Sequence, residues 1–227
     1  MWAVLKKEFK SYFLSPIGYV VIGIFLFVFS VFFYLTSFQT GTVNLGALYY
    51  YTAVYGLIIV APILTMRIFA EERKTGTEQL ILTSPVGMGG VVFGKFLAAM
   101  SVIGITLLAT FMYFGIVCFF GKPNIITVLV GMLGFILVSA AALSIGMFAS
   151  SITENQIIAG IITITFLVMT LFIQSDNELL NNLTLIGFYQ KFPSGVLSLK
   201  EIIGLVSFTG MFTAFTIIVM QRRKLVK

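Results

Sequence analysis

Histidine is absent from the 227-residue sequence, and cysteine occurs once, at Cys118. The missing histidine removes the commonest general base and the commonest transition-metal ligand. A single thiol allows neither an intrachain disulfide nor a thiolate cluster that could hold a metal ion. We therefore expect neither a catalytic site nor a metal site in the chain, and no cofactor of its own.

Charge is also scarce. Charged residues make up 10% of the chain, hydrophobic residues make up 59%, and the mean hydropathy is +1.08. A soluble domain of this length needs many more charges to cover its surface. The sequence therefore predicts an all-α integral membrane protein. The net charge of +6 does not indicate a nucleic-acid partner, because the positive side chains lie beside hydrophobic segments.

Stretches without charge locate the membrane spans, because a helix needs roughly 20 apolar residues to cross the hydrocarbon core. Residues 11–66 include no charged side chain, and these 56 positions are enough for two spans and a turn. Over the whole chain the pattern predicts six transmembrane helices. They cover residues 17–38, residues 48–66, the stretch between Lys95 and Lys122, and residues 125–150, 156–173 and 202–220.

The distribution of Lys and Arg predicts the orientation of these spans. The loops on one side carry eleven of them, whereas the loops on the other side carry only Lys122, Lys191 and Lys200. The excess places both termini in the cytoplasm, which agrees with an even number of spans. No small-residue cleavage site follows the first apolar run, so we expect no cleavable signal peptide.

Residues 1–15 are expected to form an amphipathic helix at the membrane surface. At about 100° per residue, one arc carries Trp2, Leu5, Phe9, Tyr12 and Phe13, and the adjoining face carries Lys6, Lys7 and Lys10. Such a helix lies in the headgroup layer with its lysines against anionic lipid. It either anchors the first span alone or also contacts a cytosolic partner. The dipeptide Ser15-Pro16 ends it.

The cytosolic segment, residues 67–90, is the most informative part of the chain, because residues 67–85 carry six of the 22 charged residues. Gly76 is expected to end one helix, Thr77 to cap a second, and Ser84-Pro85 to stop it. Leu80, Ile81 and Leu82 would give that second helix an apolar side. A solvated loop is the alternative. Apolar residues in this number favour docking against lipid or a soluble subunit.

Residues 176–200 are predicted to lie on the outer side. They are apolar at many positions, but Asp176, Pro193 and Gly195 interrupt the pattern too often for a span. Two short helices that dip into the outer leaflet, or that cover the outer end of a pathway, fit this pattern. An ordinary surface loop is the alternative.

An ATP-binding loop is excluded. Gly89 to Lys95 matches Gly-x-x-x-x-Gly-Lys, but Phe96 occupies the position where Ser or Thr would bind Mg²⁺.

The spans also lack the ionisable groups that gradient-driven carriers usually place at membrane depth. The energy for any transport must therefore come from outside this chain. A run of small residues at 139–149 indicates either tight helix packing or an apolar substrate route.

The stretch from Pro62 to Pro85, PILTMRIFAEERKTGTEQLILTSP, resembles the type-2 ABC transporter permeases. It is most similar to the branch that includes the gliding-motility and nitrous-oxide-reductase-maturation permeases. The start WAVLKKEFK, the Ser15-Pro16 pair and the plan of six spans with an apolar outer segment before the sixth also resemble that family. The specific part is Glu-Glu-Arg-Lys-x-Gly-Thr and the Ser-Pro that closes the segment.

The resemblance implies a single permease domain, residues 1–227, that forms the membrane half of an ATP-driven exporter in a bacterial plasma membrane. It also implies a second permease chain, identical or different, and two separate ATPase subunits that bind ATP and Mg²⁺. In that family a cytosolic helix after the second span docks in a groove of the ATPase. By position this role falls on Glu71, Glu72, Arg73, Thr75, Gly76, Thr77 and Glu78.

We therefore predict an ABC exporter permease subunit without an ATPase site of its own. Two other classes stay open: a membrane scaffold or assembly subunit that transports nothing, and a channel or gradient-driven carrier. Stimulation of an ATPase by substrate would separate a transporter from a scaffold. A channel would need a polar pore lining, which the spans offer only as Ser and Thr.

Overall fold

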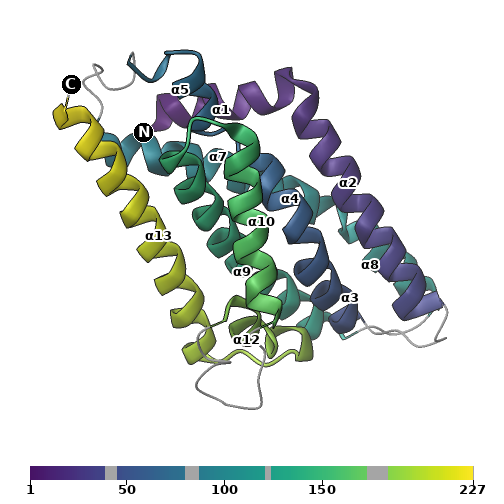
Figure 1. The fold of residues 1–227 in the computed structure, drawn as a ribbon. Coiled ribbons are helices and arrows are strands. Elements are labelled where there is room, and N and C mark those ends of the chain that lie inside the picture. The colour runs from purple at the N-terminus through teal and green to yellow at the C-terminus, as the bar shows by residue number, and fades with distance from the viewer. Residues whose placement is uncertain (39–44, 80–86, 121–123, 173–183, 227) are drawn as a thin grey trace.

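The computed structural model describes residues 1–38, 45–79, 87–120, 124–172 and 184–226. Its elements in these ranges are all helical, so the expected all-α fold is confirmed there. Figure 1 shows the long helices running side by side, with α1 lying across one end of the bundle. The first half comprises α1 (Trp2–Leu14), α2 (Pro16–Phe33), η1 (Tyr34–Phe38), α3 (Leu45–Tyr51), η2 (Thr52–Gly56), α4 (Leu57–Thr65) and α5 (Ala70–Lys74). The second half comprises α7 (Met88–Ala109), α8 (Phe111–Phe120), α9 (Ile125–Ile152), α10 (Gln156–Phe172), α12 (Leu185–Tyr189), η3 (Phe192–Ser194) and α13 (Leu199–Val226).

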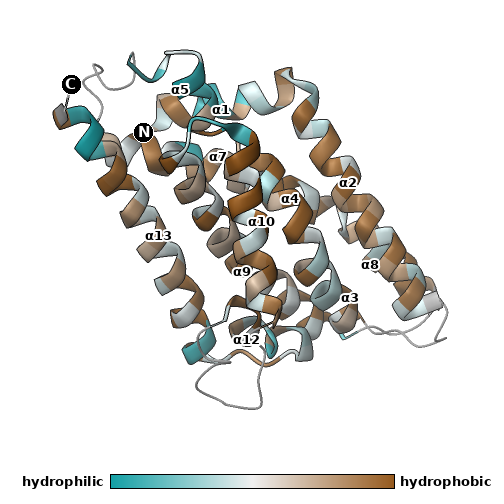
Figure 2. Ribbon diagram, viewed as in Figure 1, coloured by the Kyte–Doolittle hydropathy of each residue, from teal (hydrophilic) through white to brown (hydrophobic). Residues whose placement is uncertain are grey.

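Five helical stretches are long and apolar enough to cross a membrane. They are Pro16–Ser37, Leu45–Lys74, Met88–Phe119, Ile125–Ile152 and Leu199–Leu225. Helix α10 is also apolar but is 17 residues long. Hydrophilic residues gather at the two ends of the bundle, around α1, α5 and the end of α13 on one side and around the start of α13 on the other (Figure 2). This distribution is typical of an integral membrane protein.

The second span ends where the charge pattern predicts, because α4 stops at Thr65 and residues 66–69 form a turn before α5. The third starts earlier than predicted, at Met88, seven residues before Lys95. A charge was expected to mark the end of this span, but the ammonium group of Lys95 has partners inside the protein. Helix α10 corresponds to the expected fifth span, and Ile173 at its end lies outside the described residues.

Helix α9 forms the centre of the bundle and packs against α4, α7, α10 and α13. Its small-residue run is buried: Ala141 and Ser144 have no exposed surface, and Ala142 is 1% exposed. Small side chains let neighbouring helices approach closely where lipid offers no hydrophobic driving force. Tight packing, the first of the two interpretations of this run, therefore accounts for it.

At the end of the bundle away from α1, residues 184–198 fold back onto the helices. The Tyr189 hydroxyl in α12 is buried and donates a hydrogen bond to the Tyr49 carbonyl oxygen, 3.1 Å away. The Thr184 hydroxyl caps α12 by accepting from Gly187 N at 3.0 Å. These contacts make residues 184–198 part of the folded bundle. Residues 176–183 of the predicted outer segment lie outside the described residues.

Gly134 in α9 is the position where η3 comes closest to the central helix. A Cβ atom added there would lie 2.5 Å from Cβ of Phe192. We predict that Gly134→Ala lowers the free energy of unfolding by about 1–3 kcal/mol, because η3 must shift to admit the methyl group. Thermal unfolding in detergent micelles would measure the change.

The matched control is Gly104→Ala in α7, where the added Cβ has no neighbour within 4 Å. Alanine is about 1 kcal/mol more favourable than glycine inside a helix, so this variant should be neutral or slightly stabilised. Equal melting temperatures for the two variants would show that the contact with Phe192 does not limit the packing.

Candidate functional site

The candidate site lies where α5 follows the second membrane span. Figure 1 shows α5, α1 and both chain ends at the same end of the bundle. Helix α5 has only five residues and ends at Lys74, with Thr75 as its C-cap, and the next residue, Gly76, has a φ of 75°, which L side chains rarely adopt. The expectation that Gly76 ends a helix is therefore confirmed. Of the expected second helix, Glu78 and Gln79 are described and helical, whereas residues 80–82 and the Ser84-Pro85 stop lie outside the described residues.

The start of α5 is fixed by Ser150, near the end of α9. Its buried hydroxyl oxygen accepts hydrogen bonds from Phe69 N and Ala70 N, both at 3.1 Å, and donates one to the Met66 carbonyl oxygen at 3.2 Å. The first N–H groups of a helix have no partner within the helix and need an acceptor. Here the acceptor comes from a different span, so the position of α5 is tied to α9.

Lys95 in α7 fixes the middle of α5. Its ammonium group donates to Glu72 Oε1 at 2.7 Å, to Glu8 Oε1 at 3.1 Å and to the Ile68 carbonyl oxygen at 3.1 Å. Lys95 is 2% exposed, and its Nζ lies 5.4 Å from the centre of the Phe69 ring. All three ammonium protons are thus used. Lys95 was expected to mark the cytosolic end of a span. In the structure it lies within α7, two turns after the helix begins, and its side chain is buried.

Arg73 fixes the end of α5 to the end of α9. Its guanidinium group donates to the carbonyl oxygens of Ser151 at 2.6 Å and Ile152 at 3.1 Å. These are the last carbonyl groups of α9, which lack partners within the helix, and cations are favoured at the C-terminal end of a helix. Buried Glu78 lies between Arg73 and Arg223 of α13, with closest N–O distances of 3.6 Å and 3.4 Å.

Arg67 and Glu71 form a third ion pair, with two N–O contacts of 2.6 Å and 2.8 Å. Both side chains are about one-third exposed, and a pair in this setting contributes little stability. They line a polar groove of about 370 Å³ between α1 and α5, together with Lys7 of α1 and Thr75 and Thr77 of the following turn. The charges of the groove are paired within the protein.

The predicted site residues divide into two groups. Glu72, Arg73 and Glu78 point inward and hold the segment to the bundle. Lys74, Thr75, Gly76 and Thr77 are exposed and form what we call the tip. The Thr75 hydroxyl donates to the Glu71 carbonyl oxygen at 2.9 Å and lies 3.0 Å from the Thr77 hydroxyl oxygen. The tip is therefore an ordered turn, and Glu71 lies between the two groups with intermediate exposure.

Helix α1 packs its Val4, Glu8 and Tyr12 face against the bundle, whereas Trp2 is 73% exposed. The Tyr12 hydroxyl donates to the Leu64 carbonyl oxygen at 3.1 Å, and burial raises the pKa of this hydroxyl, so it stays a neutral donor. Lys6, Lys7 and Lys10 are exposed and Phe9 is half-buried. The face toward the bundle therefore shares Tyr12 with the predicted apolar arc, whereas Trp2 of that arc is turned outward.

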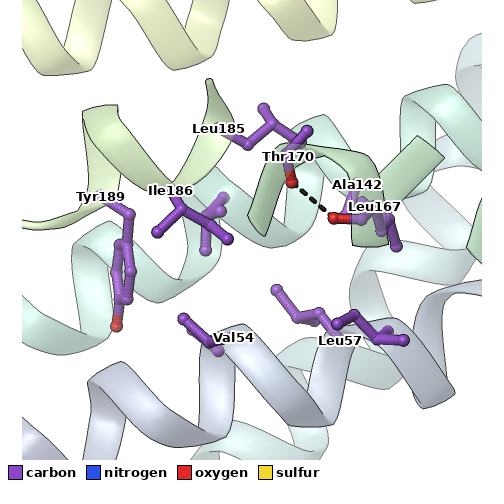
Figure 3. A pocket seen from close by; sticks show the side chains of 11 residues that line it. Val54, Leu57, Ala142, Leu167, Thr170, Leu185, Ile186 and Tyr189 are labelled. Carbon is purple, nitrogen blue, oxygen red and sulfur yellow. Dashed lines mark hydrogen bonds between the residues drawn. The ribbon is translucent and has the colours of Figure 1, made fainter. Parts of the chain in front are cut away.

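A separate apolar pocket lies among η2, α4, α9, α10 and α12 (Figure 3). Val54, Leu57, Leu167 and Ile186 line it, and the Thr170 hydroxyl in its wall donates to the Leu167 carbonyl oxygen at 2.6 Å. The hydroxyl is thus satisfied within its own helix. Among the described residues, no group of three or more Cys, Asp or Glu side chains is placed to hold a metal ion.

Comparison with known protein families finds a match that covers most of the chain. A family model described as ABC-2 family transporter protein matches residues 2–220. A search of curated proteins found no match. The matched range includes α1, α5 and the long helices, so the site and the bundle fall within one family domain.

The contacts of Ser150 lead to a test. We predict that Ser150→Ala raises the amide exchange rate of residues 69–79 about tenfold, because the first N–H groups of α5 lose a buried acceptor at a cost of about 1–3 kcal/mol. Hydrogen exchange followed by mass spectrometry would measure it. The matched control is Ser151→Ala, whose hydroxyl donates only to the Phe148 carbonyl oxygen of its own helix, at 2.7 Å. Equal exchange in both variants would contradict the prediction.

Proposed function

The chain belongs to the ABC-2 family of transporter proteins, and we propose on that premise that it is a permease subunit coupled to separate ATPase subunits through α5 and the tip. Members of this family are membrane-spanning transport subunits that lack an ATPase site of their own. They associate with ABC ATPase subunits. The family match supports a transport subunit over the scaffold and the gradient-driven carrier.

The observation that carries the proposal is that α5 is held in place by contacts with other helices. A five-residue helix at the end of a span is bonded to α7 and α9 by buried side chains, while its tip is left exposed. Glu78, which directly follows the tip, contacts Arg223 of α13. A segment that transmits a push needs this arrangement, because a loosely attached tip would move without moving the spans. The tip offers Lys74 and hydroxyl groups to a partner, and these fit an acidic or polar groove.

The charges around the tip support a negatively charged partner surface. Among the described residues, the exposed charged side chains at this end are Lys6, Lys7, Lys10, Lys74, Arg222, Lys224 and Glu154. The carboxylates of Glu8, Glu72 and Glu78 are turned toward the interior, and the partly exposed carboxylate of Glu71 is paired with Arg67. The surface left for a partner is therefore basic, and it fits both anionic lipid headgroups beside α1 and an acidic docking groove beside the tip.

We propose six spans, with α10 as the fifth. At about 1.5 Å per residue, its 17 residues extend about 25 Å, close to the roughly 30 Å of a hydrocarbon core. Both chain ends lie at the end of the bundle that carries most of the Lys and Arg residues (Figure 1). The positive-inside rule supports a cytoplasmic location for both termini, α1 and α5 in a bacterial plasma membrane.

The finer features of the proposal rest on the resemblance of residues 62–85. They are export as the direction, pairing with a second permease chain, ATP and Mg²⁺ bound by the partner ATPase, and membership in the gliding-motility and nitrous-oxide-reductase-maturation branch. In the same way, α1 is proposed as an interfacial helix, with Trp2, Phe9 and its three lysines toward lipid.

The proposed topology can be tested by single-cysteine labelling in a Cys118→Ala background. Thr77→Cys in the tip should react with an impermeant maleimide only after the membrane is permeabilised. Val196→Cys, at a position 51% exposed at the opposite end, should react in intact cells. Labelling of the tip in intact cells would reverse the orientation and remove the ATPase from reach of α5.

Docking can be tested by reversing the charge of an exposed side chain that does not hold α5 to the bundle. We predict that Lys74→Glu weakens association with the ATPase subunit of the same transporter at least about tenfold, because a like charge placed in an interface is costly. Gln79→Pro, which would interrupt the helical turn after the tip, should have the same effect. Co-purification and ATP hydrolysis by the complex are the measurements.

Lys200→Glu is the control, because it makes the same charge change at an exposed position at the far end of α13. Glu72→Lys is not a suitable probe, since it would break the contact with Lys95 and disturb the fold. Normal association and normal ATP hydrolysis in both Lys74→Glu and Gln79→Pro would contradict docking through the tip.

A further inference from the structure

Lys95 joins two segments that are far apart in the sequence. Glu8 of α1 lies 87 residues before it and Glu72 of α5 lies 23 residues before it, yet both carboxylates contact its ammonium group. The Lys7 ammonium of α1 adds a second, looser contact to Glu72, with a closest N–O distance of 3.9 Å. A buried cation with two carboxylates from different elements holds those elements at a fixed separation.

The packing around Lys95 makes this link stiff. The preceding residue, Gly94, sits so close to α1 that an added Cβ would lie 3.1 Å from the Met1 carbonyl oxygen and from the Val4 side chain. Lys95 also holds the Ile68 carbonyl oxygen, in the turn that leads into α5. Helix α7 is therefore in contact with α1 on one side and with α5 on the other at a single level of the helix.

We propose that Lys95 is a positioning residue that makes α1 and α5 move as one body. Displacement of the tip would then also displace the helix at the membrane surface, and the position of α1 among the headgroups would set the position of the tip. That consequence for coupling rests on the proposed function. The mechanical link itself does not, because it depends only on contacts within this chain.

The test is a distance measurement on the full chain in lipid nanodiscs, without any ATPase. In a Cys118→Ala background, spin labels at Lys6→Cys in α1 and Lys74→Cys at the tip report the separation by pulsed electron paramagnetic resonance. We expect a narrow distance distribution that broadens about twofold or more in Lys95→Met, because the two carboxylates lose their shared cation. Lys95→Arg should restore a narrow distribution, because the guanidinium group can also donate to both.

Lys10→Met is the matched control, since it removes an exposed lysine from α1 and should leave the distribution narrow. Lys95→Met could also fail to fold. The variant Glu8→Gln, Glu72→Gln, Lys95→Met removes the buried charges together, and it should melt near the wild type and still give the broad distribution. A narrow distribution in that folded variant would overturn the proposal. Failure of ATPase docking through the tip would leave this result unaffected.

Discussion

A helix of five residues cannot keep its place by its own hydrogen bonds, because forming a first helical turn is unfavourable and short helices depend on tertiary contacts. The position of α5 therefore depends on side chains from other helices. Ser150 supplies the acceptor for its first N–H groups, and Lys95 binds Glu72. Arg223 contacts Glu78, which directly follows the tip. The exposed tip can serve as a contact surface because these bonds define where it stands.

The same bonds decide which charges are left on the surface. Carboxylates near α5 are used to bind buried or half-buried cations, so exposed lysines and arginines dominate this end of the protein. Burying a pair gives little net stability, but removing one partner leaves a charge without a counterion, at a cost of about 3–5 kcal/mol. These ion pairs thus act mainly to fix geometry, and they leave a basic end surface as a by-product.

The sequence predicts the helices well where hydrophobic runs are long, because crossing a membrane constrains length and charge together. It misplaces Lys95, since a lysine near the start of an apolar run looks like a flank, and its partners Glu8 and Glu72 are distant in the sequence. It indicates that α1 is amphipathic but not which side of it faces the bundle. Val4, Glu8 and Tyr12 face it, and Tyr12 and Glu8 find hydrogen-bonding partners there in the Leu64 carbonyl oxygen and in Lys95. Tertiary contacts decide which charged side chains near α5 point inward, and no local sequence pattern reveals these contacts.

The order in which the anchors are synthesised has a consequence for biogenesis. Ribosomes produce α5 before Lys95 and well before Ser150 and Arg223, and Arg223 lies near the end of α13, the last long helix described. During translation the tip therefore exists for a time without the bonds that define its place. The last of them forms only after α13 has inserted beside α9. A chain in which α13 has not packed would lack the contact between Arg223 and Glu78, so the tip reaches its defined position only when the last described helix is in place.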